Sequence, residues 1–118
     1  MWQLTEPKWP VWVMDGIRAH MRRVIDREAC GLVVRSEIDG LQYVRSVNVA
    51  VGDDDYMIEP ALVERYLDRI VAVIHSHPNG SEELSEIDRL RSHPQFMYGI
   101  WARGDLYVWC STATGSVG

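Results

Sequence analysis

The chain of 118 residues has few of the features of secreted or membrane-spanning proteins, namely cysteines, long apolar runs and a signal sequence. Its only two cysteines, Cys30 and Cys110, lie in apolar segments. We therefore expect free, packed thiols and a reducing, cytoplasmic compartment rather than a disulfide. No apolar run approaches the roughly 20 residues needed to span a bilayer. The N-terminus also lacks the charged-then-apolar order of a secretory signal, so we expect no membrane association.

Positive charge is scarce as well. The net charge is −5, from 12 Lys and Arg against 17 Asp and Glu. This balance argues against nucleic-acid binding, because phosphate contacts need clustered cations. The nearest approach to a basic cluster has helical spacing and indicates a solvated helix face; it consists of Arg18, Arg22, Arg23 and Arg27.

The composition is that of an ordinary globular domain, with 47% hydrophobic residues and 25% charged residues. The chain shows no internal repeat, linker or low-complexity stretch. We expect one domain over residues 1–118, with residues 111–118 as a flexible tail.

Apolar spacing predicts alternating helices and strands. After Pro10, apolar residues recur at helical intervals, which indicates an amphipathic helix ending near residues 26–28; these residues are Val13, Ile17, Met21, Val24 and Ile25. Further helices are expected over residues 60–68 and after Ser85. Strands are expected over residues 30–34, 41–51, 56–58, 70–74, 96–101 and 106–110. Arg45 interrupts the alternation of its strand, as at a bulge. The result is an α/β (α+β) sandwich with a mixed central sheet flanked by helices.

The most informative stretch is HSHPNGSEELSEID, residues 75–88. An apolar strand runs directly into His75, and side chains two apart on a strand point to the same face. His75 and His77 should therefore face one point, to which Asp88 returns at the start of a short helix. Two imidazoles and one carboxylate are typical of a catalytic zinc site with an open fourth position. The sequence predicts Zn²⁺ held by His75, His77 and Asp88.

This stretch has two other interpretations. In one, the histidines merely end a strand and Ser85-x-x-Asp88 is an ordinary helix cap. In the other, the zinc is structural, but such sites are normally closed by four protein ligands. The joint spacing of His-x-His, seven residues and Ser-x-x-Asp favours a catalytic metal.

This spacing resembles the signature of the JAMM (MPN-type) zinc metalloproteases, in which a distant Glu precedes His-x-His-x(7)-Ser-x-x-Asp. The segment Glu28-Ala29-Cys30-Gly31-Leu32 is similar to the one that carries the family's catalytic Glu. The resemblance implies a cytidine-deaminase-like fold, with Glu28 as general base and then acid. It also implies that Ser85 donates a hydrogen bond to the developing oxyanion. The same hydroxyl is expected to cap the short helix, because it can donate and accept at once.

The resemblance further implies a hydrolase that cuts a peptide or isopeptide bond. The expected substrate is a protein, cut next to the C-terminus of a ubiquitin-like or sulfur-carrier protein or during phage tail assembly. HSHPNG together with the segment over residues 56–60 is most similar to bacterial and phage-tail members. The alternative is a noncatalytic MPN-type scaffold, although such members usually lack the metal ligands.

The remaining chemistry-bearing residues are predicted to be structural. His93 is expected at the surface, His20 is assigned no role, and Cys30 has no activating base in the sequence nearby. The tryptophans are expected to serve packing. The alternative for Trp2, Trp9 and Trp12 is an apolar contact surface for a partner.

Overall fold

The computed structural model describes residues 1–25, 27–38, 40–51 and 55–111, apart from the side chain of Ile87. Its elements in chain order are β1 (Trp2–Thr5), α1 (Val11–Arg23), β2 (Cys30–Ser36), β3 (Gly40–Ser46), α2 (Pro60–Tyr66), the 3₁₀ turn η1 (Leu67–Arg69), β4 (Ile70–Ser76), α3 (Glu86–Arg91), β5 (Met97–Ala102) and β6 (Asp105–Ser111). The strands form one mixed sheet in the order β1-β6-β5-β4-β2-β3. Strands β4 and β5 are parallel, and the other neighbouring strands are antiparallel. The predicted α+β sandwich is confirmed.

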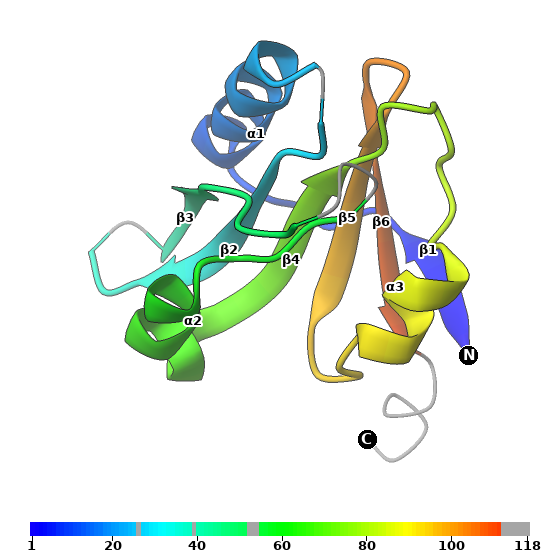
Figure 1. Cartoon of the computed structure of the whole chain (residues 1–118). Helices are drawn as coiled ribbons and strands as arrows, with labels where there is room; N and C mark the ends of the chain where they lie inside the picture. The colour runs from blue at the N-terminus through cyan, green and yellow to red at the C-terminus, as the bar shows by residue number, and fades with distance from the viewer. Residues whose placement is uncertain (26, 39, 52–54, 112–118) are drawn as a thin grey trace.

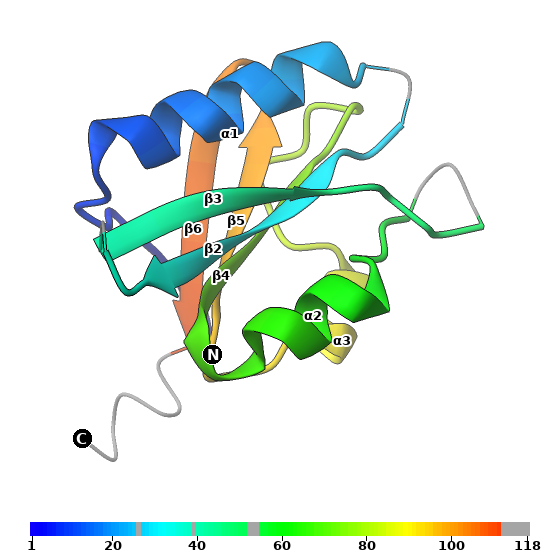
Figure 2. The same ribbon diagram turned by 90° about the vertical axis from the view of Figure 1, so that its left-hand side faces the viewer.

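Helices cover both faces of the sheet, with α1 on one side and α2 and α3 on the other (Figures 1 and 2). Alternating side chains on the central strands fill the two layers. Val33 and Ile74 pack under Ile17 of α1, whereas Leu32 and Ile100 face the layer of α2. Burial on both faces explains why the central strands are almost continuously apolar.

Helix α1 buries the predicted apolar residues Val13, Ile17 and Met21. It ends at Arg23, earlier than the predicted limit at residues 26–28. Ile25 therefore lies beyond the helix, and its side chain is 79% exposed instead of buried.

Strand β3 is shorter than the predicted strand over residues 41–51, because it ends at Ser46. Residues 56–58 form no strand. The Asn48 side chain explains both corrections: its Oδ1 accepts hydrogen bonds from the backbone N–H groups of Ala50 and Met57, at 3.0 Å each. These bonds replace the ladder that a strand would need. The predicted end of this strand at residues 52–55 lies mostly outside the described residues.

The predicted bulge at Arg45 is wrong. The pairing of β2 with β3 is regular from Cys30 and Ser46 to the end of the strands. The irregularity lies instead between Val33 and Val34, in the pairing of β2 with β4.

The other boundaries differ by one or two residues from the predicted ones. Pro60 begins α2 as expected, but α2 ends at Tyr66, two residues before the predicted end, and Leu67 is 58% exposed. Ser111, predicted to begin a flexible tail, is the last residue of β6, and residues 112–118 lie outside the described residues.

Strand β1 was missed, because four residues give too short an alternation to recognise. It pairs with β6, and Trp2 packs edge-on against the Tyr98 ring with the centroids 5.5 Å apart. The expected packing role of Trp2 is confirmed. Trp12, in contrast, is 54% exposed, although its indole N–H donates to the Leu41 carbonyl at 2.8 Å.

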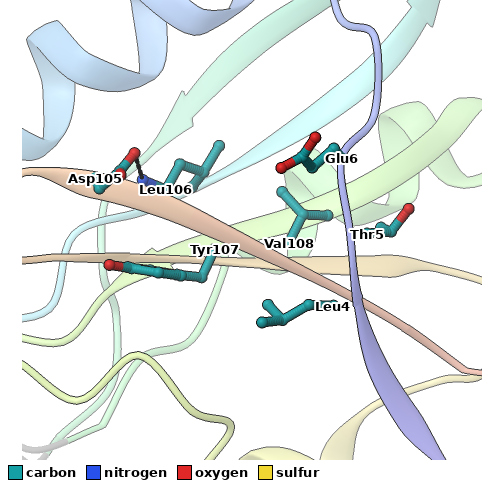
Figure 3. Close-up of a pocket in the computed structure, with 7 residues that line it drawn as sticks. All are labelled: Leu4, Thr5, Glu6, Asp105, Leu106, Tyr107 and Val108. Carbon is teal, nitrogen blue, oxygen red and sulfur yellow. Dashed lines mark hydrogen bonds between the residues drawn. The ribbon is translucent and has the colours of Figure 1, made fainter.

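Strand β1 leaves part of β6 unpaired, because its last residue, Thr5, lies opposite Val108. The hollow beside this open edge measures about 700 Å³ and is lined by the end of β1 and the start of β6 (Figure 3). The Asp105 carboxylate accepts a hydrogen bond from the Leu106 N–H at 2.9 Å. A charged side chain that occupies a backbone donor discourages pairing with another strand.

Both cysteines are free, as predicted. None of the helices formed by the described residues has the length and apolarity needed to cross a bilayer.

Gly31 is required where it stands, because the Tyr43 ring lies directly over it. A Cβ on Gly31 would come within 2.6 Å of Tyr43 Cε1 and closer still to the hydroxyl. We expect Gly31→Ala to destabilise the fold by about 1–3 kcal/mol through overpacking. The matched control is Gly16→Ala in α1, whose Cβ would meet Tyr43 at an ordinary 3.6 Å. Removing a helical glycine should stabilise by roughly 0.5–1 kcal/mol. Urea unfolding of both variants measures the difference, and equal stabilities would contradict the packing argument.

Candidate metal centre

His75 and His77 lie at the carboxyl end of β4, the central strand. His75 is the penultimate residue of β4 and its side chain is 0% exposed, while His77 follows the strand directly. The N–H of His77 donates to the Trp101 carbonyl at 2.9 Å, which continues the parallel pairing past the end of the strand. This extension places both imidazoles on the face covered by α2 and α3.

Asp88 is brought to the same place by the first turn of α3. Ser85 caps this helix, as predicted: its Oγ accepts from the Asp88 N–H at 3.0 Å. In return, Asp88 Oδ2 accepts from the Ser85 N–H at 3.0 Å, which completes a capping box. The cap fixes the carboxylate with one oxygen aimed at the histidines.

Three potential ligand atoms meet in a compact triangle. His75 Nε2 and His77 Nε2 are 3.0 Å apart, and Asp88 Oδ2 is 3.3 Å from the first and 3.2 Å from the second. Tetrahedral zinc with bonds of about 2.0–2.1 Å separates its ligand atoms by roughly 3.3–3.4 Å. The three separations are close to this spacing, and the pair of imidazole nitrogens would have to move apart slightly to hold one small divalent cation.

The two imidazoles are oriented by different means. His77 Nδ1 is 2.9 Å from the Ser81 carbonyl, so it carries the hydrogen and leaves Nε2 free to face the cluster. The His75 ring stacks on Tyr56 at 4.0 Å and 13°. Its Nδ1 is buried and has no hydrogen-bond partner among the described residues. Ring stacking therefore orients His75, whereas a hydrogen bond orients His77.

The electrostatics of the cluster favour a bound positive charge. Burial alone would raise the pKa of Asp88, but the contacts with His75 and His77 lower it overall, so Asp88 is a carboxylate at neutral pH. The pKa of His75 is lowered, chiefly by burial. For His77 burial also acts to lower the pKa, yet the bonds to Asp88 and the Ser81 carbonyl raise it overall. An ionised carboxylate beside a neutral imidazole is the protonation state that metal binding needs.

Glu28 lies next to the two histidines. It lies between α1 and β2, is 7% exposed, and its Oε1 is 3.9 Å from His75 Nε2. One ligand atom from each of Glu28, His75 and His77 falls within 4.8 Å of the others, so this group too could hold a metal ion. The structure thus brings together every side chain that the sequence assigned to the site.

Backbone and side-chain hydrogen bonds anchor Glu28. The Glu28 carbonyl accepts from Asn48 Nδ2 at 2.8 Å. The next residue, Ala29, donates its N–H to Ser76 Oγ at 2.8 Å and accepts from the Ser76 N–H at 2.9 Å. Sequence reasoning missed Asn48, although an amide in the apolar run Val47-Asn48-Val49 is a visible anomaly.

A hollow of about 190 Å³ connects this cluster with the surface. Its lining is polar and comprises Glu28, Asp55, His77, Asn79, Ser81, Ser85 and Asp88. The larger hollow of Figure 3 lies at the β1–β6 edge and contains no histidine or cysteine. The candidate chemistry therefore belongs to the smaller hollow.

The positions of His93 and Cys30 agree with the structural roles predicted for them. His93 is exposed. Cys30 is buried, and burial is the main cause that raises the pKa of its thiol to about 11. Such a thiol is not a nucleophile at neutral pH.

The fold and the site define an α+β domain whose central strand ends in a cluster of histidine and carboxylate groups suited to a cation. Residues 10–112 match the prokaryotic homologs of the JAB domain, and the chain belongs to that family. The resemblance seen in the sequence is thereby confirmed. The chain is also similar in fold to the solution structure of a protein from Desulfitobacterium hafniense, with a TM-score of 0.63 and 23% identity over 79% of this chain and 72% of the other. No curated protein matches the chain.

We expect the protein to bind about one Zn²⁺ per chain. Asp88→Ala removes one corner of the triangle and should weaken zinc affinity by roughly 100-fold or more, since even outer groups around a metal contribute 10- to 100-fold. Titration calorimetry with zinc measures the loss. The matched control is His93→Ala, which removes an exposed histidine and should leave the affinity unchanged. Full zinc affinity in Asp88→Ala would exclude Asp88 as a ligand.

Proposed function

We propose that the protein is a zinc-dependent hydrolase that cleaves a peptide or isopeptide bond. The observation that carries this proposal is the triangle of His75 Nε2, His77 Nε2 and Asp88 Oδ2, with sides of 3.0–3.3 Å, beside the buried Glu28 carboxylate. Membership of the JAB family supports it. Three protein ligands leave one coordination position for a reacting molecule, as in catalytic rather than structural zinc sites.

His75, His77 and Asp88 would hold the ion. A bound zinc ion lowers the pKa of water to about 7 and polarises a carbonyl group. Glu28 is proposed to act as the general base. Its carboxylate reaches to within 3.9 Å of His75 Nε2 and borders the hollow, so it takes a proton from the attacking water. The same carboxyl returns that proton to the departing amine.

Ser85 contributes a hydrogen-bond donor at the rim. Its Oγ accepts from the Asp88 N–H through one lone pair, and this leaves the O–H to donate. Ser85 lines the same hollow as Glu28. Donation to the carbonyl oxygen of the substrate stabilises the negative charge that develops there.

The substrate is proposed to be a protein with an extended terminal segment. A hollow of about 190 Å³ admits a few atoms of peptide but no folded surface. A flexible C-terminus fits this restriction, as in a ubiquitin-like or sulfur-carrier protein, and so does a linear segment processed in phage tail assembly. The free cysteines fit a cytoplasmic setting.

Glu28→Gln should keep zinc but lose activity by at least about 100-fold, because an amide cannot shuttle a proton. The assay is cleavage of a panel of ubiquitin-like and sulfur-carrier fusions, with zinc content measured in parallel. Phenanthroline should abolish cleavage by the wild type, and added zinc should restore it. Unchanged turnover in Glu28→Gln would remove Glu28 from the mechanism. A wild type that binds zinc but cleaves nothing in the panel would favour the scaffold alternative.

The two roles of Ser85 can be separated with two substitutions. Ser85→Ala loses both the cap and the hydroxyl, and should destabilise by about 1 kcal/mol. Ser85→Gly also lacks the hydroxyl, yet glycine is a fair N-cap and should cost only a few tenths of a kcal/mol. If the hydroxyl stabilises the oxyanion, both variants lose roughly 10²–10³ in kcat. Wild-type kcat in Ser85→Gly would leave the hydroxyl with the capping role alone.

A further inference from the structure

A second polar hollow lies on the opposite face of the sheet, between α1 and β3. Its volume is about 190 Å³, and it is lined by Gly16, Ala19, His20, Arg23, Tyr43 and Arg45. Gly16 and Ala19 keep it open, because they present almost no side chain. The candidate metal site faces α2 and α3, and Figure 2 shows these helices on the other side of the sheet from α1.

His20 forms the buried wall of this hollow. It is 9% exposed, and its Nδ1 is 2.7 Å from the Tyr43 hydroxyl. Burial raises the pKa of Tyr43, so the phenol keeps its proton and donates it to Nδ1. The neutral imidazole then carries its own hydrogen on Nε2. That N–H has no acceptor among the residues that the structure describes.

Arg23 and Arg45 bring two positive charges to the same hollow. Burial first, and then the charges of Arg45 and Arg23, lower the pKa of His20. Neither arginine pairs with a carboxylate within the described part of the chain. Arg18 and Arg91, in contrast, have acidic partners in Asp15 and Asp55.

Among the described residues, two arginines without a carboxylate partner stand out in a protein with a net charge of −5. The helix dipole accounts for Arg23 in the last turn of α1, where a cation is stabilised. It does not account for Arg45, which lies on β3 and lines the same hollow as Arg23. Two cations and a neutral N–H donor around a small hollow are complementary to an anion.

We propose that this hollow binds an oxyanion, the phosphate or carboxylate group of a ligand, through Arg23, Arg45 and the Nε2–H of His20. Charge-assisted bonds from two guanidinium groups supply the affinity, and the imidazole N–H fixes the position of one oxygen. The inference is independent of the hydrolytic function, because none of these residues belongs to the metal cluster.

Nuclear magnetic resonance of the labelled full chain tests this proposal. Inorganic phosphate, acetate and a short Glu-containing peptide are titrated separately at pH 7 and constant ionic strength. At least one should give saturable shifts centred on His20, Tyr43 and Arg45. Tighter binding of phosphate would identify a small phosphorylated ligand, and tighter binding of the peptide would identify a carboxylate on a protein partner. Shifts that grow linearly with all three anions would overturn the proposal.

Three variants distinguish a built pocket from diffuse charge. Arg45→Gln should weaken binding by about 10- to 100-fold, the usual effect of losing a charged hydrogen bond. Ala19→Leu keeps every charge but fills the hollow, and should abolish saturation. Arg22→Gln is the matched control, because it removes the same charge from the last turn of α1, next to Arg23 but outside the hollow. If Arg22→Gln weakens binding as much as Arg45→Gln does, only a general field acts and the proposed site does not exist.

Discussion

The site depends on one carboxylate oxygen, Oδ2 of Asp88. It accepts a hydrogen bond from the Ser85 N–H and lies within 3.3 Å of both imidazole Nε2 atoms. The loop and short helix that follow β4 are tied to the strand end through this contact. The capping box thus does two things at once: it satisfies the first turn of α3 and it delivers a negative charge to two histidines. A helix of only six residues is useful here because its start, and not its length, carries the chemistry.

Burying these polar groups in a sheet core is costly unless a cation or proton joins them. Ionised Asp88 is stabilised by its imidazole neighbours, and His75 stays neutral because it is buried. The Tyr56 ring stacks on His75 without satisfying its Nδ1. Such a cluster contributes little to folding by itself, and its compact geometry suits a cation. The surrounding apolar sheet supplies the rigidity that holds the three candidate ligand atoms in position.

The sequence predicted the site better than the periphery of the fold. Helix α1 and strands β2, β4 and β6 follow from strong periodicity and from local residue preferences, and so do the strand-end histidines and the Ser85 cap. One group of errors lies where a side chain takes the place of a backbone hydrogen-bond partner. Asn48 bonds the backbone of its own loop, and so residues 47–51 leave the sheet although their valines alternate like a strand. Strand β1 depends on a partner more than 100 residues away along the chain, which no local pattern can show.

Gly31 connects the two faces of β2. On one side the Glu28-to-Leu32 segment brings Glu28 and Cys30 toward the metal cluster, and on the other Gly31 lies under the Tyr43 ring. Only a residue without Cβ lets that ring lie flat enough for its hydroxyl to reach His20 at 2.7 Å. The glycine of the Glu28-to-Leu32 segment therefore has a local reason in this chain. Because Gly31 has no side chain, the Tyr43 ring packs against the strand beside Glu28. The same contact positions the His20 imidazole in the proposed anion site between α1 and β3.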